Sequence, residues 1–508
     1  MTPFRWSSLV LPCLLGLAVV LAWHLREVMN ASEELSSELG SAQNRLGDVG
    51  RERDLAQREV LRLRTLRDLL ETDVKRLEER VERQTLMEEI PVVLERVRGY
   101  GLRRPLKVRW VDRAFTKKFV QGELARQLPK GYAEAYSRTL ARVGLLPGGY
   151  ELERAALNLM TEQAAGFYDP RSQILYVNDG MPAAELVLSH ELAHALADQR
   201  FDLQKMLATS PLDQDDRAFA LRALVEGDAT FAMQRYFAQS LSLWKLFELV
   251  GDVAALTGMD QAELQAAPMY VREPLVRAYL DGMKFVTALH QVGGNARVDR
   301  AFAEPPVSSA QILHPQKYLR GEKPTELMLP DATPILGAGW RILHENTFGE
   351  LGFATLFQSV PTAQPLAKAA AEGWGGDRLR AYAAEGGRLV VLWRSTWDTP
   401  QDRAEYLTAH GLVLEQRYGP RNGPAVVPPT VPPTVPPTVL PTVPPSALTS
   451  GAQQVPREAS ALRWKTPHGV ILLAGRDRDA VLVEGAVDDA QADRLAALLS
   501  VPVISSAP

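Results

Sequence analysis

The sequence predicts an α+β protein in which a mostly helical central domain follows an N-terminal apolar segment and a coiled coil. A small α/β domain closes the chain. Three observations carry this prediction: a heptad pattern before residue 100, mostly helical sequence after it, and strand-like runs on both sides of a proline-rich segment. The predicted boundaries are 1–25 for a transmembrane anchor or signal segment, 30–98 for the coiled coil, 100–335 for the central domain, 336–422 for a mixed α/β region, 423–450 for a Pro/Thr/Val-rich linker and 451–508 for the tail.

Composition limits the classes of function. The chain has 508 residues, 46% of them hydrophobic, so it can bury several cores. Its net charge is −4 and its basic residues alternate with acidic ones, which argues against a nucleic-acid partner. Cys13 is the only cysteine, which excludes a disulfide framework and a cysteine-ligated metal. A metal site must therefore use His, Asp or Glu.

The N-terminal stretch Trp6–Trp23 is uncharged and long enough to cross a bilayer, with a tryptophan at each end. It predicts a single-pass anchor in a cell membrane, with the N-terminus in the cytoplasm and the rest of the chain on the exported side. A signal peptide cleaved after Val20–Ala22 is the alternative, and a buried core helix is a weaker one. The anchor and the signal peptide both export the bulk of the chain.

The segment that follows carries a heptad pattern. From Leu35 to Val81 the apolar residues recur at steps of four and three, and the flanks are dense in Glu and Arg. The pattern predicts a parallel coiled coil over residues 30–98 that joins two copies of the chain as a homodimer. A single solvated helix is the alternative. Pro91 and Gly99 are expected to end the helix.

The central domain is predicted to contain a few short strands among helices. An Asp-Pro turn between two β-rich arms indicates a hairpin just before the apolar run that carries the histidines. The expected elements are a strand at Leu106–Val111, helices at about 114–128, 131–143 and 151–165, a hairpin at Gly166–Val177, and mostly helical chain from 215 to 300.

The C-terminal part is interrupted by a low-complexity run, Val427–Pro445, which is too rich in proline to pack. The half before it has one clear strand, Leu389–Trp393, and a helix at about 400–411. The tail has strands at Val470–Ala474 and Ala480–Val483 and a final helix. Each half is too small to be stable alone. We therefore expect the proline run to be an inserted loop and the tail strands to pair with Leu389–Trp393 in one sheet.

Two histidines and a glutamate lie within the apolar run Leu186–Gln199. His190 and His194 are four residues apart, so on a helix both rings can reach one metal ion, with Glu191 beside them. This is the HExxH pattern of zinc peptidases. Two histidines that bind no metal are the alternative interpretation.

A catalytic zinc needs a third protein ligand. The metzincin continuation is absent because Ala197 and Arg200 stand where it requires Gly and His. Glu226 follows an apolar run on a helix, where an unpaired carboxylate would be costly, so it is the predicted third ligand. A salt bridge between Glu226 and Arg222 is the alternative.

Further polar residues complete the candidate site. Asp198 and Asp228 are predicted to accept the free ring N–H of a ligating histidine. The alternative for Asp198 is that it begins a turn. A donor to the developing oxyanion is also needed, and the candidates are His314, Tyr318 and Tyr279. His314 could instead be a structural residue that caps a loop.

At these residues the chain resembles a family of largely uncharacterised bacterial zinc metallopeptidases of the gluzincin type. The resemblance rests on residues 190–199, 223–230 and 305–318, with a weaker similarity at 373–378, and it covers about residues 100–330. It implies a zincin-like fold with an edge strand before the active-site helix, and it implies Glu226 as the third ligand. It implies no particular substrate.

The expected function is that of a membrane-anchored metallopeptidase that uses Zn²⁺ to hydrolyse peptide bonds of exported or envelope proteins. Glu191 is expected to take a proton from the attacking water and His314 is the provisional second catalytic residue. The hairpin arm Gln173–Val177 is expected to offer an edge to which a peptide or protein substrate adds as a strand. The alternative is a catalytically silent, membrane-tethered coiled-coil scaffold that binds peptides.

Overall fold

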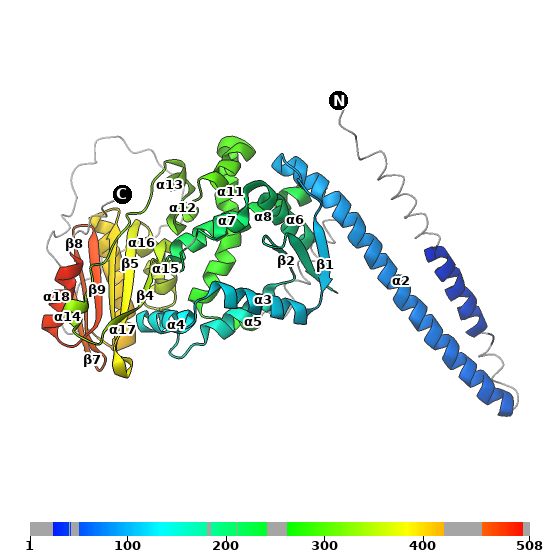
Figure 1. The fold of residues 1–508 in the computed structure, drawn as a ribbon, viewed down its shortest axis with the longest axis horizontal. Coiled ribbons are helices and arrows are strands. Elements are labelled where there is room, and N and C mark those ends of the chain that lie inside the picture. The colour runs from blue at the N-terminus through cyan, green and yellow to red at the C-terminus, as the bar shows by residue number, and fades with distance from the viewer. Residues whose placement is uncertain are drawn as a thin grey trace, which may run out of the picture. The chain divides into compact units, whose positions relative to one another are not determined.

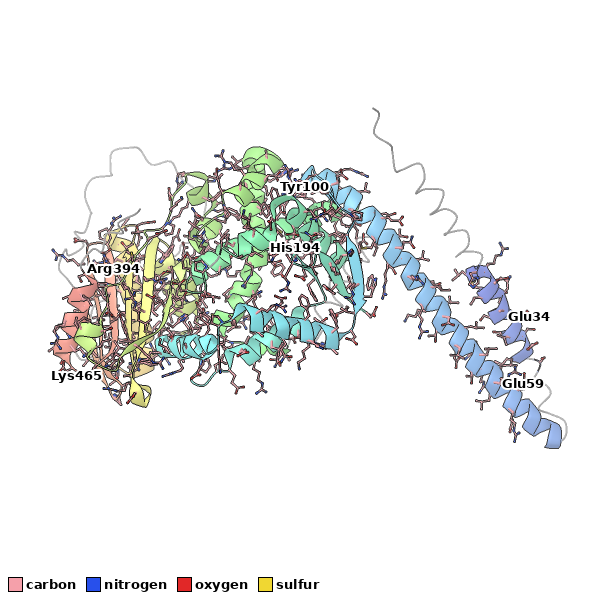
Figure 2. All side chains as sticks on the ribbon, in the orientation of Figure 1. Glu34, Glu59, Tyr100, His194, Arg394 and Lys465 are labelled. Atoms are coloured by element: carbon pink, nitrogen blue, oxygen red, sulfur yellow. The ribbon has the colours of Figure 1, made fainter. Side chains whose placement is uncertain are left out.

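A computed structural model describes residues 24–39, 41, 50–179, 184–209, 211–240, 262–420 and 460–500. The chain divides into two compact units, Met1–Ile90 and Pro91–Pro508. The second unit combines a mostly helical part with a six-stranded antiparallel sheet, which confirms the α+β class (Figure 1). Figure 2 marks His194 in the helical part and Arg394 and Lys465 on the sheet.

The first unit consists of a helix over residues 24–39 and most of the long helix α2 (Gly50–Arg98). Among the heptad positions of α2, Val60 and Leu63 are buried while Val81 is exposed. Pairing of this helix with a second copy stays a prediction. No helix in the described part of the chain is long and apolar enough to cross a membrane, and Trp6–Trp23 lies outside that part.

Pro91 does not end the long helix, so that prediction was wrong. The helix continues through Pro91 to Arg98, and Gly99, with φ of +77°, ends it and donates its N–H to the Glu95 carbonyl at 2.7 Å. A proline within a helix costs about 3 kcal/mol. Here the last two turns bury Leu94 and Val97 in the second unit, and this burial offsets the cost.

The helical part begins with a three-stranded sheet in the order β1-β3-β2. β2 and β3 form the predicted hairpin, and β1 pairs with β3 in parallel. β3 is therefore the central strand, so the prediction that the Gln173–Val177 arm offers a free edge was wrong. The elements are β1 (Lys107–Val111), α3 (Arg113–Gln127), α4 (Tyr132–Val143), α5 (Leu152–Gln163), β2 (Gly166–Asp169) and β3 (Ile174–Asn178).

The rest of the helical part packs around two long helices, α8 and α11, which bury Leu224, Phe285 and Leu289 between them and their neighbours. Gly293 and Gly294 interrupt the helical conformation of α11. The elements are α6 (Ala184–Phe201), α7 (Leu203–Leu207), α8 (Asp215–Ser240), α10 (Ala262–Ala266), α11 (Met269–Ala303), α12 (Ser309–Leu313) and α13 (Pro315–Leu319). The short helix α14 (Thr333–Leu336) follows and packs on the six-stranded sheet.

The six-stranded sheet has the order β4-β5-β6-β9-β8-β7. In it β6 pairs with β9, with Trp393 opposite Leu482, which confirms the prediction that the tail shares one sheet with Leu389–Trp393. The predicted proline-rich linker itself lies outside the described residues. The elements are β4 (Arg341–Asn346), α15 (Gly349–Gln358), the 3₁₀ turn Gln364–Leu366, α16 (Ala367–Ala371), β5 (Trp374–Ala383), the 3₁₀ turn Glu385–Gly387, β6 (Leu389–Trp397), α17 (Pro400–Tyr418), β7 (Ser460–Thr466), β8 (Gly469–Arg476), β9 (Asp479–Ala486) and α18 (Asp489–Leu499).

Helices cover both faces of this sheet, because its strands are apolar on both sides. Trp393 packs in the core with α15 and α17, while its neighbour Leu392 packs in the core with α14 and α18. Glu484 of β9 is fully buried and pairs with Arg142 of α4 and Arg417 of α17. These ion pairs join the tail to the helical part of the same unit.

Candidate metal centre

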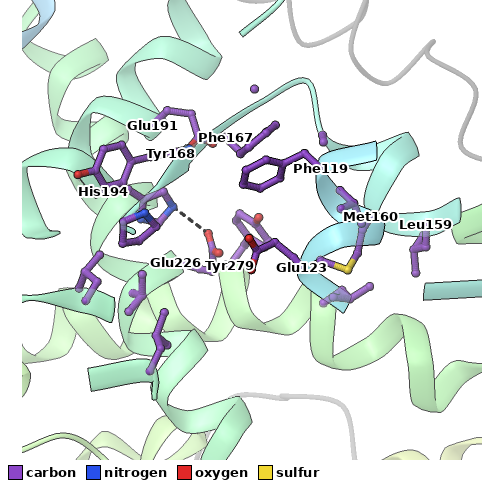
Figure 3. A pocket seen from close by; sticks show the side chains of 18 of the residues that line it. Phe119, Glu123, Leu159, Met160, Phe167, Tyr168, Glu191, His194, Glu226 and Tyr279 are labelled. Atoms are coloured by element: carbon purple, nitrogen blue, oxygen red, sulfur yellow. Dashed lines mark hydrogen bonds and ion pairs between the residues drawn. The ribbon is translucent and has the colours of Figure 1, made fainter. Parts of the chain in front are cut away.

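Helix α6 carries His190, Glu191 and His194, and Figure 3 shows Glu191 and His194 at the cavity. The opposite face of α6 packs against the core through Leu188, Leu192 and Ala195, as the sequence predicted. The ligand atoms of His190, Glu191 and His194 all lie within 4.8 Å of one another and could hold a metal ion.

Glu226 on α8 also lies beside the two histidine rings. The two Nε2 atoms of His190 and His194 are 3.0 Å apart, and Glu226 Oε2 lies 3.2 Å from the first and 3.3 Å from the second. A tetrahedral metal ion about 2.0–2.1 Å from each donor would place neighbouring donors about 3.3 Å apart. The three atoms thus form a triangle that fits one face of a tetrahedral site. No ion pair joins Glu226 to Arg222 among the described residues.

The electrostatics of this triangle favour positive charge. Burial acts to raise the pKa of Glu226, but the facing His194 and His190 rings outweigh it and hold that pKa well below its ordinary value. Burial acts to lower the pKa of His194, yet the Glu226 carboxylate raises it to about 9. A divalent cation would supply the same positive charge between these groups.

Glu191 is held by a neighbouring strand. Its Oε2 accepts the backbone N–H of Tyr168 on β2 at 2.8 Å, and burial raises the pKa of the Glu191 carboxyl. The Tyr168 hydroxyl donates to Asp198 Oδ2 at 2.8 Å, and Asp198 Oδ1 accepts the N–H of Leu203 at 3.0 Å. Asp198 was predicted to support a histidine ring. Its hydrogen bonds go instead to Tyr168 and Leu203, so it acts on Glu191 through β2.

Replacing Tyr168 by Phe tests this connection. The change removes only the hydroxyl that fixes β2 to Asp198, so we expect kcat for peptide hydrolysis to fall about tenfold while metal content stays the same. Steady-state kinetics and metal analysis are the measurements. Tyr382→Phe, which removes a hydroxyl that accepts the Ala332 N–H at 3.0 Å in the distant sheet, is the control. An unchanged kcat for Tyr168→Phe would argue against a positioning role.

Asp228 makes no hydrogen bond to a histidine ring in the described part of the chain, although it lies close enough to His194 for its charge to raise the pKa of that ring. It is buried and pairs with the equally buried Arg98, whose Nε lies 3.1 Å from Asp228 Oδ1. Arg98 also reaches Asp299 and Asn295 on α11, each at 3.1 Å. Burial raises the pKa of Asp228 although Arg98 acts to lower it. Asp228 therefore fastens the end of α2 to the helices behind the metal triangle.

Gly227, between Glu226 and Asp228, allows the close approach of α8 and α11. A Cβ at Gly227 would lie 2.2 Å from the Gly282 carbonyl carbon, and a Cβ at Gly282 would lie 2.1 Å from the Ala223 oxygen. Both contacts are with backbone, which has no room to yield. The sequence motif around Glu226 thus needs glycine for packing, a role that the sequence alone did not indicate.

We expect Gly227→Ala to separate α8 from α11 and displace Glu226. The free energy of unfolding should fall by about 3 kcal/mol, with loss of bound metal. Denaturant unfolding and metal analysis are the measurements. The control is Gly122→Ala in α3, where a Cβ would meet Arg126 at an ordinary 3.5 Å, so stability should hold or rise. Wild-type stability with full metal in Gly227→Ala would contradict the packing argument.

Of the three candidate oxyanion donors, only Tyr279 lies at the site. Its ring stacks on His190 with centroids 5.6 Å apart. Although the residue is 43% exposed at the cavity rim, desolvation of the hydroxyl and the nearby Glu226 and Glu191 carboxylates raise the pKa of Tyr279. His314 instead pairs with Glu350 at 2.7 Å, and the Tyr318 hydroxyl donates to the Glu304 carbonyl at 2.8 Å. Neither His314 nor Tyr318 lines the cavity at the triangle.

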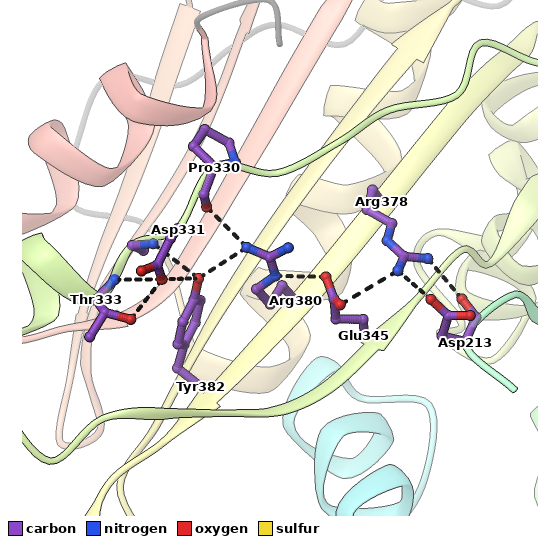
Figure 4. A network of polar contacts seen from close by, with 9 residues as sticks. Asp213, Pro330, Asp331, Thr333, Glu345, Arg378, Arg380 and Tyr382 are labelled. Atoms are coloured by element: carbon purple, nitrogen blue, oxygen red, sulfur yellow. Dashed lines mark hydrogen bonds and ion pairs between the residues drawn. The ribbon is translucent and has the colours of Figure 1, made fainter. Parts of the chain in front are cut away.

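The motifs at residues 305–318 and 373–378 connect elements of the fold and do not line the metal cavity. In the third motif, Ser309 donates its N–H to Asp216 at 2.7 Å, and its hydroxyl accepts the N–H of Leu351 at 3.1 Å, which ties α8 to α15. In the weaker motif, Arg378 donates to the Asp213 carbonyl at 2.9 Å. It thereby joins the loop before α8 to a network on β4 and β5 that includes Glu345 (Figure 4).

A cavity of about 630 Å³ opens at the metal triangle. In Figure 3, Glu191 and His194 lie on one side of the cavity and Phe119, Leu159 and Met160 on the other, with Phe167 between Glu191 and Phe119 in this view. Apart from Glu191, His194 and Glu226, the only charged residue in its lining is Glu123, which pairs with Arg126 and Arg171. Large apolar side chains are exposed at its rim, namely Met160, Leu207, Val276, Tyr279 and Leu280.

Fold and site together define an α+β protein with a His–Glu cluster that could hold a metal ion. Residues 340–432 match a family model described as a domain of unknown function, DUF8575. The match includes β4, β5, β6 and α17 but none of the tail strands that complete the sheet. No curated protein and no solved structure matches the chain.

Proposed function

We propose that the chain is a zinc-dependent metallopeptidase with a zincin-like catalytic domain that hydrolyses peptide bonds. The observation that carries the proposal is the triangle of His190, His194 and Glu226 donor atoms with edges of 3.0 to 3.3 Å. Two imidazoles and one carboxylate are a ligand set typical of catalytic zinc. When bound, zinc lowers the pKa of water to about 7 and polarises a carbonyl oxygen.

The side chains around the triangle suit this chemistry. Glu191 takes the proton of the attacking water and later returns it to the leaving amine. The Tyr168 N–H keeps one Glu191 oxygen fixed. The Tyr279 hydroxyl is protonated at neutral pH, as in any tyrosine, so it can donate to the oxyanion of the substrate.

β2 is the strand to which a substrate could add. It lies at an edge of the small sheet, and its residues alternate between facing β3 and facing outward. Tyr168 turns its N–H outward to Glu191, so Gly166, two residues earlier, turns its backbone groups the same way. The N–H and the carbonyl of Gly166 can pair with the backbone of an extended peptide.

We further propose that Trp6–Trp23 anchors the chain in a bacterial cell membrane and that its substrates are exported or envelope proteins. The uncharged stretch with a tryptophan at each end supports this placement.

The heptad pattern supports a homodimer through the coiled coil. The placement in the membrane has its own test. A reporter fused after residue 100 should be active only in an exported compartment, and cytoplasmic activity would contradict the topology.

The test of the peptidase proposal uses the purified full-length chain in detergent. We expect about one zinc per chain. Casein should be cleaved, a chelator should abolish cleavage and added Zn²⁺ should restore it. Stoichiometric zinc without cleavage of any protein substrate would instead favour the peptide-binding scaffold.

A further inference from the structure

A second cavity, of about 320 Å³, shares three helices, α5, α8 and α11, with the lining of the metal cavity. On α8, Phe219 and Arg222 line the second cavity, while Val225 and Glu226 line the first. Residues three or four apart lie on one face of a helix. One stripe of α8 therefore lines both cavities.

The two facing helices repeat this arrangement. On α5, Ala156 lines the second cavity and Leu159 the first. On α11, Val271 lines the second cavity and Leu275 the first. Because the same faces of α5, α8 and α11 line both cavities on successive turns, the cavities are consecutive compartments of one groove. From Asp215 to Glu226 this groove follows α8 for about 16 Å, the length of about five residues of extended chain.

The second compartment, like the first, is lined mostly by apolar side chains, but it also holds charged groups. Of the two carboxylates that α8 contributes to it, Asp215 accepts from Tyr270 at 2.6 Å and Asn346 at 2.7 Å, and also from Tyr136, and Asp216 accepts the N–H of Ser309 at 2.7 Å, so both have little capacity for a ligand. Arg222 and Glu153 differ, because both are exposed at the lining and neither has a hydrogen bond or ion pair with any other described residue.

Arg222 stands one helical turn before the predicted ligand Glu226, between the two compartments. An arginine offers only donors and a glutamate only acceptors. From two different helices of the lining, Arg222 on α8 and Glu153 on α5 can bind a backbone carbonyl and a backbone N–H of a chain that runs along the cavity.

We propose that the second cavity is a remote subsite of the peptidase, in which Arg222 and Glu153 bind the main chain of an extended polypeptide. The preferred substrate then has about five residues on one side of the cleaved bond, with an apolar side chain next to the metal. Di- and tripeptides are poor substrates because they leave the second compartment empty. This inference rests on the proposed peptidase function.

The test is a series of fluorogenic peptides with one fixed scissile bond, extended on either side from two to about seven residues. We expect kcat/KM of the wild type to rise about tenfold as the chain on one side grows past the third residue. Arg222→Gln should lower the ratio of kcat/KM for long to short peptides by about the same factor. Arg235→Gln changes an exposed arginine of α8 that lines neither cavity and should keep the wild-type ratio.

A kcat/KM that does not depend on peptide length, or an equal loss on short and long peptides in Arg222→Gln, would overturn the proposal. Circular dichroism checks that each variant is folded. Failure of the peptidase function is seen separately, as no hydrolysis of any peptide by the zinc-loaded wild type. Fluorescence anisotropy of labelled peptides on Glu191→Gln then measures the same length dependence as Kd, and equal Kd for short and long peptides would overturn the groove.

Discussion

Glu191→Gln is expected to retain one zinc per chain and to lose about a thousandfold in kcat. The amide has almost the shape of the carboxylate, and its oxygen can still accept the Tyr168 N–H that holds Glu191 at 2.8 Å. It cannot take a proton from water, because a neutral amide is not a base at neutral pH. Glu191→Gln should therefore lower kcat and leave the zinc content unchanged.

Metal analysis and steady-state hydrolysis of a peptide that the wild type cleaves are the measurements. Glu326→Gln is the matched control, because Glu326 is exposed and lines neither the metal cavity nor the second cavity. If Glu191→Gln kept wild-type kcat, the general base would be another group. If it lost its zinc as well, Glu191 would be a ligand.

Glu226→Ala should remove both metal and activity. It leaves only His190 and His194 as ligands and takes away the negative charge that offsets positive charge in the triangle. Loss of a direct ligand should weaken zinc binding by more than the roughly 100-fold seen when an outer partner is removed. Equilibrium zinc titration against a competing chelator measures this affinity.

Glu326→Ala serves as the control for this variant, with full metal and activity expected. Thermal unfolding in the presence of chelator separates loss of a ligand from loss of the fold. A Glu226→Ala chain that still held stoichiometric zinc would mean that the third ligand had been assigned to the wrong residue.

The parts of the site that depend on local geometry could be predicted from the sequence. The four-residue spacing of His190 and His194 fixes their common face on any helix. Glu226 was found because a carboxylate after a buried apolar run needs a partner. The pairing of the tail with Leu389–Trp393 followed from two halves that were each too small to fold.

The parts that depend on distant neighbours could not be predicted. Gly227 is required because α11 crosses α8 at Gly282. The residues near Gly227 in the sequence do not predict this crossing. The partner of Asp198 depends on where β2 places Tyr168. Likewise β3 became a central strand only because β1, from more than sixty residues earlier, pairs with it through Lys107 to Ile174.

The buried ion pair of Arg98 with Asp228 determines at which residue a recombinant fragment should begin. A fragment that began at residue 100, the predicted start of the central domain, would lack Arg98 and leave Asp228 and Asp299 without their buried cation. Removing one partner of such a pair typically costs about 3–5 kcal/mol. That is a large share of the stability of an ordinary domain, about 5–15 kcal/mol. A fragment meant to fold and to bind metal should therefore begin upstream of Pro91, where the second compact unit starts.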